Sequence, residues 1–238
     1  MAAANDKPTR AEIKRAAERL QKAIEQHGLL LKHDARLPCA TQLIAGGSVP
    51  GSWWSHEKGS LIYEVLSSLD DDEVAYPKLL AGKVTLVHRR LWPALVAAAR
   101  SGGAWQYEGL KLDARALLTR VQTEKRLRSD RLELAPRSRK VGILVSELES
   151  RLLVYSEGEH TEAGHHARVL FSYEAWQKKK RVRDLPDAER ALEILAGAAR
   201  SSLPERELSR LLPWEKSQKP KARPRARSGV ESRLRSRP

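Results

Sequence analysis

The chain has 238 residues, with 44 lysines and arginines against 30 aspartates and glutamates, so its formal net charge is +14. This length fits one large domain or two small ones, and a hydrophobic content of 41% suffices for a core. No apolar stretch approaches the ~20 residues of a membrane-spanning helix, no signal-peptide pattern is present, and the single cysteine, Cys39, excludes an internal disulfide. We therefore expect a cytoplasmic protein without a membrane partner, whose positive charge favours nucleic acid as its partner.

Residues 1–103 are predicted to form an N-terminal helical domain with a β-hairpin. The clearest element is a helix over residues 9–28, because Thr9 and Glu12 make a capping box and Gly28 is a stop signal. Hydrophobic spacing and turn residues then predict short helices near 38–44 and 57–69, hairpin strands at 74–80 and 84–88, and a helix at 91–100.

Residues 104–215 are predicted to form a second domain, separated from the first by Ser101-Gly102-Gly103. We expect a helix at 113–125 capped by Asp113, a short strand at 127–129, a helical turn at 130–134, a helix at 138–151, strands at 152–155 and 168–173, and a helix at 187–200. This order is typical of a winged helix-turn-helix domain. The fold class is therefore α+β and mainly α-helical; the first half resembles the same plan, without a repeat at the level of residues.

Residues 216–238 are predicted to be a disordered basic tail. They hold nine lysines and arginines against Glu231, a net charge of +8, together with three prolines and few apolar residues. The functional interpretation is contact with phosphates, and the alternative is a tail that only raises solubility.

The predicted third helix begins with three cations, Arg137, Arg139 and Lys140, which the helix dipole disfavours at that end. In helix-turn-helix proteins such a helix enters the major groove, so these cations are candidates for contacts with phosphates and base edges. The alternative is a solvated helix end, and nearby acids such as Glu147 and Glu149 would repel phosphate. The further candidates for nucleic-acid contact are His165 and His166 in the loop at 156–167, Arg168 directly after it, Arg89 and Arg90 after the hairpin, and Arg223, Arg225 and Arg227 in the tail.

Two adjacent tryptophans, Trp53 and Trp54, lie in a turn-rich segment that ends at His56. They are candidates for stacking on bases, and the alternative is that they are packing residues. With His88 and Glu64, His56 is also a candidate acid or base in an active-site pocket that would include Arg89 and Arg90.

No cofactor and no metal site are predicted. The loop from His160 to His166 carries three histidines, but it lacks a recognised zinc spacing.

Three segments carry a resemblance. Gly-Ser-Trp-Trp-Ser-His at 51–56, Gly-Lys-Val-Thr-Leu-Val-His-Arg-Arg-Leu-Trp-Pro-Ala-Leu at 82–95 and Glu-His-Thr-Glu-Ala-Gly-His at 159–165 resemble a widespread bacterial family of small uncharacterised proteins. That resemblance implies little about mechanism. The second half is also similar in plan to the winged-helix domains of crosslink-repair DNA glycosylases, but it lacks their Gln-x-Gln motif, which Gln122-Thr-Glu124 does not supply.

The sequence thus favours a nucleoid-associated protein of winged-helix type that binds duplex DNA through a basic helix start, a wing loop and a basic tail. The alternative is a glycosylase-like repair or processing enzyme that uses the region of Trp53–His56 and His88–Arg90. An interaction module for another protein is the third hypothesis, and the balance is against an enzyme.

Overall fold

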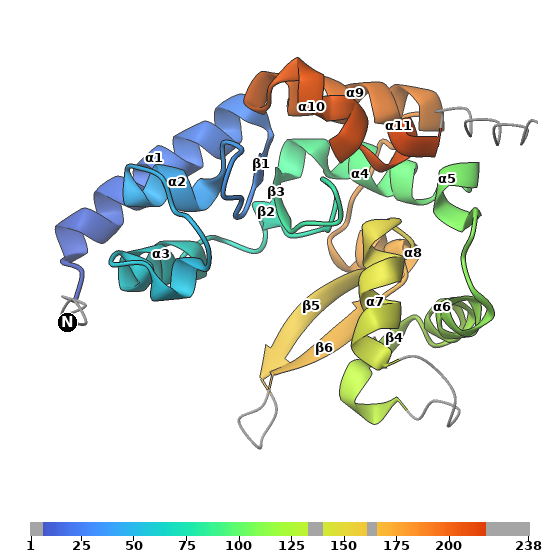
Figure 1. Ribbon diagram of the computed structural model, residues 1–238. Helices are drawn as coiled ribbons and strands as arrows, with labels where there is room; N and C mark the ends of the chain where they lie inside the picture. Colours follow the sequence, from blue (N-terminus) through green and yellow to red (C-terminus); the bar gives the residue numbers. More distant parts are fainter. Residues whose placement is uncertain (1–6, 133–139, 161–165, 218–238) are drawn as a thin grey trace, which may run out of the picture.

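The computed structural model describes residues 7–132, 140–160 and 166–217, which form helices and two small antiparallel sheets (Figure 1). The predicted α+β class, mainly helical, is confirmed. Within these residues, no helix has the length and apolarity to cross a bilayer. Arg137, Arg139, His165 and the predicted tail from 218 onward lie outside the described residues.

The first sheet is built from three short strands in the order β1–β3–β2. Its central strand, β3, pairs antiparallel with both neighbours, with Leu30 opposite Leu86 and Val74 opposite His88. Helices α1, α2 and α3 cover this sheet and bury a core of aliphatic side chains with it. The elements of this half are α1 (Arg10–His27), β1 (Leu29–Leu31), α2 (Ala40–Ala45), a 3-10 turn η1 (Trp53–Ser55), α3 (Gly59–Ser67), β2 (Val74–Ala75) and β3 (Thr85–His88).

The first helix begins and ends where its residues predict. Thr9 and Glu12 form the capping box, and Gly28 ends the helix with a φ of 81°, a left-handed conformation that glycine adopts without strain. The side chains of Ala16, Leu20 and Ile24 are buried on its inner side.

The predicted hairpin is shorter than expected, and its sheet has a third strand. Strand β2 ends at Ala75 because Pro77 has no N–H to donate; its carbonyl instead accepts the Thr85 N–H at 2.8 Å. Leu29–Leu31, which the sequence left without a predicted strand, pairs with the other side of β3.

The second sheet has the strand order β4–β6–β5, and it packs with α6 and α7 around its own core. Strand β4 pairs with β6, and β5 and β6 form a hairpin whose register runs from Tyr155 opposite Phe171 to His160 opposite His166. The elements are α6 (Leu112–Glu124), β4 (Arg126–Arg128), a 3-10 turn η3 (Ser129–Arg131), α7 (Val141–Ser150), β5 (Tyr155–His160) and β6 (His166–Phe171).

Several boundaries in this half differ from the prediction: β5 begins at Tyr155 and not at 152, and β6 ends at Phe171 and not at 173. Helix α6 begins before Asp113, with Lys111 at its N-cap, so Asp113 lies in the first turn and not at the cap. The hairpin strands extend into residues 156–160 and 166–167, which were predicted as loop. Figure 1 shows this hairpin projecting away from the body of the molecule.

The two halves share one order of elements. Among the described residues of each half, a long helix is followed by a strand, then α2 and η1 in the first half and η3 in the second, then a further helix and two strands. In each sheet the last strand lies between the first and the second. A similar plan for the first half was expected from the sequence only as a weak resemblance. The structure therefore contains the same topology twice.

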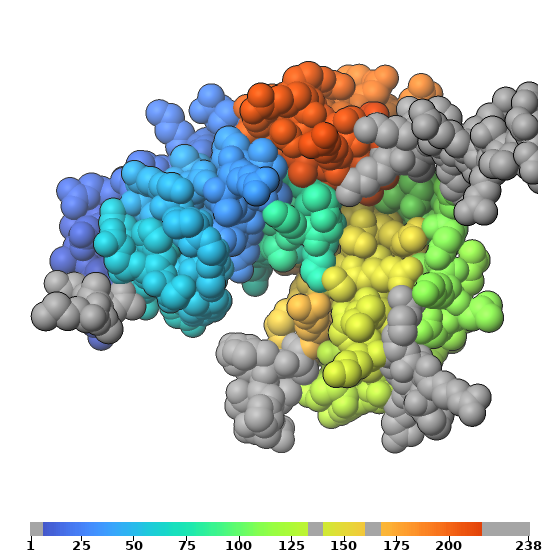
Figure 2. Space-filling model, viewed as in Figure 1, coloured from blue at the N-terminus to red at the C-terminus, as the bar shows by residue number. Residues whose placement is uncertain are grey.

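Helices from both sides of the predicted boundary at 101–103 pack together in a third core. Here α4 lies against α9, and the fully buried Trp176 contacts the rings of Trp92, Tyr155 and Tyr173. Figure 2 shows two lobes separated by a notch, with the C-terminal helices in orange and red lying across the top of both. These helices are α4 (Trp92–Ala99), α5 (Ala104–Tyr107), α8 (Tyr173–Lys179), α9 (Ala188–Ser202), α10 (Glu205–Leu211) and α11 (Pro213–Ser217).

Candidate nucleic-acid interface

Helix α7 is most exposed in its first turn, and its later residues are buried or half-buried. Leu144, Val145 and Leu148 face the core, as their spacing predicted. Lys140 occupies the N-cap position with its side chain in solvent, and Ile143 is 53% exposed. The part of this helix that is open to a large ligand is therefore its N-terminal turn.

A buried cluster of charges lies at the C-terminal end of α7. The Glu149 side chain is only 7% exposed, and its carboxylate lies 2.6 Å from the Lys78 amine and 3.3 Å from the Arg168 guanidinium. The Ser156 hydroxyl donates to the same carboxylate, and the Lys78 amine also donates to the Ser146 hydroxyl at 3.0 Å. Because Lys78 comes from the loop between β2 and β3, this cluster fixes the first half of the chain against α7.

The described cations of the second sheet are paired with acids. On its outer strands, the Arg126 guanidinium lies 2.8 Å from the Glu159 carboxylate, and Arg128 lies 2.9 Å from Asp130 and 3.8 Å from Glu159. The predicted contact residue Arg168 is held by Glu149, as described above. This sheet is therefore close to electrically neutral, and phosphate would have to compete with Glu159 and Asp130 for its arginines.

The two predicted stacking residues lie in η1 and stack on each other, with ring centroids 4.0 Å apart and planes inclined by 25°. They differ in exposure: Trp53 is half-buried against the first core, whereas the Trp54 side chain is 63% exposed. The sequence interpretation missed the third ring of this group, Tyr63, which is 49% exposed and lies 5.6 Å from Trp54 between centroids.

The predicted catalytic residues have separate partners. The His56 ring accepts the Lys58 N–H at 3.1 Å, next to α3. The His88 ring accepts the Arg90 N–H at 3.3 Å, which caps a 3-10 turn after β3, and it faces Glu73 at 3.9 Å. Within the described residues, no hydrogen bond or ion pair joins His56, His88 and Glu64 to one another.

Burial lowers the pKa of His88, and the neighbouring Arg90 lowers it further. The imidazole is therefore neutral near pH 7, which suits an acceptor of a backbone N–H.

The arginines that follow His88 are also bound within the protein. The Arg89 guanidinium lies 2.7 Å from the Glu73 carboxylate, and Arg90 donates to the carbonyl of Gln26 at 3.0 Å. In these positions both arginines tie β3 to the elements beside it. Among the described residues, no contact joins Arg89 or Arg90 to Trp53 or Trp54, so the predicted pocket is not formed there.

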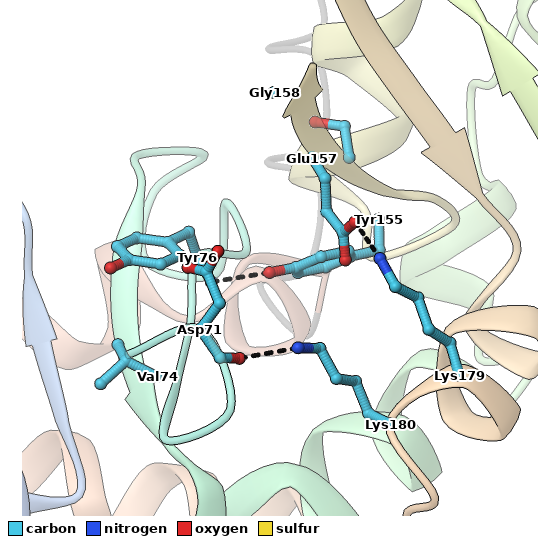
Figure 3. Close-up of a pocket in the computed structure, with 9 residues that line it drawn as sticks. Asp71, Val74, Tyr76, Tyr155, Glu157, Gly158, Lys179 and Lys180 are labelled. Carbon is cyan, nitrogen blue, oxygen red and sulfur yellow. Dashed lines mark hydrogen bonds and ion pairs between the residues drawn. The ribbon is translucent and has the colours of Figure 1, made fainter. Parts of the chain in front are cut away.

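A pocket of about 230 Å³ lies between the two halves (Figure 3). The Tyr76 N–H donates to the Tyr155 hydroxyl across it at 2.9 Å, and on its rim Lys179 is paired with Glu157. Lys180 lies 2.7 Å from Asp72 and donates to the Asp71 carbonyl at 2.8 Å. Both lysines are paired with acids of the chain, and the contacts of Lys180 with Asp71 and Asp72, like that of Tyr76 with Tyr155, join the two halves.

Tyrosine chemistry is disfavoured in this pocket. Burial raises the pKa of Tyr76 far above its ordinary value, and Asp71 and Asp70 raise it further. Its hydroxyl therefore remains protonated at any physiological pH.

The described residues contain no group of three or more histidine, cysteine, aspartate or glutamate side chains that could hold a metal ion. Residues 161–165 of the histidine loop lie outside the described part of the chain. Comparison of this chain with known protein families, with curated proteins and with solved structures finds no match.

Proposed function

We propose that this chain binds duplex DNA and is built from two winged-helix modules in tandem. The observation that carries the proposal is the repeated topology: both halves run helix, strand, helical turn, helix, strand, strand, and in both sheets the last strand is central. In this plan the third helix approaches the major groove, and the hairpin after it reaches the sugar-phosphate backbone. The corresponding elements here are α3 and α7, with the hairpins that follow them.

In the second module, DNA contact falls to the exposed first turn of α7 and to the projecting β5–β6 hairpin. Lys140 lies at this turn, and Arg137 and Arg139 directly precede it in the sequence. The face of α7 that carries Ser146 and Glu149 is already occupied by Lys78. The helix therefore enters a groove by its N-terminal end and not along its length.

Most of the phosphate neutralisation falls to residues 216–238, because the described arginines of the second sheet are paired with acids. The tail supplies affinity that depends on salt, and the folded modules supply orientation on the duplex.

The proposal is tested by fluorescence anisotropy with a short labelled duplex over a range of salt concentrations. We expect the triple variant R137E/R139E/K140E to bind at least ~10-fold more weakly than a control with the same change in charge. The control is R190E/R200E/R210E, which reverses exposed arginines on α9 and α10. Equal losses in the two variants would show that only net charge matters and would refute the role of α7.

Removing the acid that pairs with the second sheet is expected to strengthen binding. In Glu159→Gln, Arg126 loses its carboxylate partner at 2.8 Å and becomes available to phosphate, whereas Arg128 keeps its pair with Asp130 at 2.9 Å. We expect an affinity about 2- to 5-fold higher, with a salt dependence steeper by up to about one unit of log–log slope. Glu193→Gln, which frees Arg190 on α9, is the matched control and should change neither quantity. Weaker binding by Glu159→Gln would contradict a role for this sheet in DNA contact.

A further inference from the structure

The first half keeps an aromatic surface in contact with water. Five large hydrophobic side chains are exposed among the described residues, and only two of them, Trp54 at 63% and Tyr63 at 49%, are in ring contact with each other. We call Trp53, Trp54 and Tyr63 together the aromatic platform. An exposed patch of this kind commonly marks a binding surface, because aromatic rings left in water contribute no hydrophobic free energy to the fold.

The platform is held in place before any ligand arrives. Trp53 packs against the first core and stacks beneath Trp54. The turn is closed by the His56 N–H, which donates to the Trp53 carbonyl at 3.2 Å. Helix α3 starts against the backbone of both tryptophans: a Cβ on Gly59 would lie 3.0 Å from the Trp54 carbonyl oxygen and 3.1 Å from that of Trp53. A ligand that stacks here therefore orders little that is not already ordered.

The charges beside the platform favour an anionic ligand with a planar face. The Lys32 amine lies 5.9 Å from the centroid of a Trp53 ring. Lys58 lies at the N-terminus of α3, where its amine donates to the Ala45 carbonyl at 2.7 Å. Glu64 directly follows Tyr63, so the platform itself offers little to a phosphate. Contact between the rings and a base, with the phosphates lying toward the lysines, satisfies both observations.

We propose that the aromatic platform stacks on an unpaired base of DNA. Bases inside a duplex already stack on their neighbours, so only a base in a single strand, a bulge or a mismatch can offer a free face to Trp54 and Tyr63. The inference rests on the proposed DNA-binding function, and it adds a class of DNA: duplex interrupted by an unpaired base.

The test compares three ligands with the full chain: a paired duplex, the same duplex with one extra unpaired thymine, and that bulged duplex with an abasic residue in place of the thymine. We expect wild type to bind the thymine bulge about 10-fold more tightly than the abasic bulge. Trp54→Ala and Tyr63→Ala should each reduce or abolish that preference, and Trp54→Phe should keep part of it. Leu112→Ala, at a side chain that is 85% exposed in the other half, should leave the preference unchanged.

Two results would overturn the inference: no preference for the thymine bulge in wild type, or the same preference in Trp54→Ala as in wild type. Binding of the paired duplex keeps the two proposals separate. A protein that binds paired duplex without preferring the bulge retains the proposed function and loses the platform. A protein that binds the bulge through Trp54 but does not bind the paired duplex retains the platform and loses the proposed function. Thermal unfolding of each variant checks that its fold is kept, as the exposure of both side chains predicts.

Discussion

Deletion of residues 218–238 is expected to weaken duplex binding by about two to three orders of magnitude at 200 mM salt, because the deleted segment carries eight lysines and arginines against one glutamate. Each phosphate that is neutralised contributes about −0.9 to the slope of log affinity against log salt concentration. If about six of these cations reach phosphates, the slope becomes shallower by roughly five units on deletion. The measurement is a salt titration of duplex affinity by fluorescence anisotropy.

Two variants of the tail separate charge from sequence. A tail in which the same residues are shuffled should behave as wild type, because counterion release depends on the number of cations and not on their order. A tail of the same length with glutamine in place of every lysine and arginine should behave as the deletion does. An unchanged salt slope in the deleted chain would exclude the tail as a phosphate-binding arm.

The second large effect is on stability. Glu149→Ala is expected to lower the free energy of unfolding by about 3 kcal/mol, because it leaves the Lys78 amine, with a side chain only 15% exposed, without its carboxylate partner. The same change removes the acceptor of the Ser156 hydroxyl and the partner of Arg168. Urea unfolding followed by circular dichroism measures the loss.

A control and a rescue identify the cause of this loss. Glu193→Ala breaks an exposed pair with Arg190 on α9 and should cost less than about 0.5 kcal/mol. The double variant Lys78→Met/Glu149→Leu should recover most of the lost stability, because it replaces both buried charges with apolar groups of similar size. If Glu149→Ala unfolds as wild type does, the charge cluster does not fasten the first half to α7.

Elements with strong local signals could be predicted from the sequence. Helix α1 is marked at both ends by its own residues, Thr9 and Gly28, and the inner stripe of α7 follows from the spacing of Leu144, Val145 and Leu148. These features depend on side chains within a few residues of one another, which is the range that pattern reasoning covers.

Features that depend on distant partners were missed. Leu29–Leu31 is a strand only because β3, more than fifty residues later in the chain, pairs with it. The outer part of the β5 strand, Ser-Glu-Gly-Glu-His at 156–160, lacks the alternation of apolar and polar residues by which a strand is recognised from sequence.

In the candidate site, too, local features could be predicted and features that depend on distant residues could not. Glu149 looked like a repulsive surface acid, but Lys78 and Arg168, from two other segments, enclose and neutralise it. His88 looked like a catalytic candidate, and it caps a turn. The sequence shows that Trp53 and Trp54 are neighbours, whereas their mutual stacking and the exposure of Tyr63 beside them depend on how α3 meets the turn.

Hydrogen–deuterium exchange of the full chain with and without a short duplex tests the central claim most directly. We predict slower exchange at the first turn of α7, at residues 140–144, and along the β5–β6 hairpin. Exchange in α9 and α10, which lie across the top of the molecule, should stay unchanged. Protection confined to α9 and α10, or none in α7 and the hairpin at saturating duplex, would contradict the assignment of these elements to DNA binding.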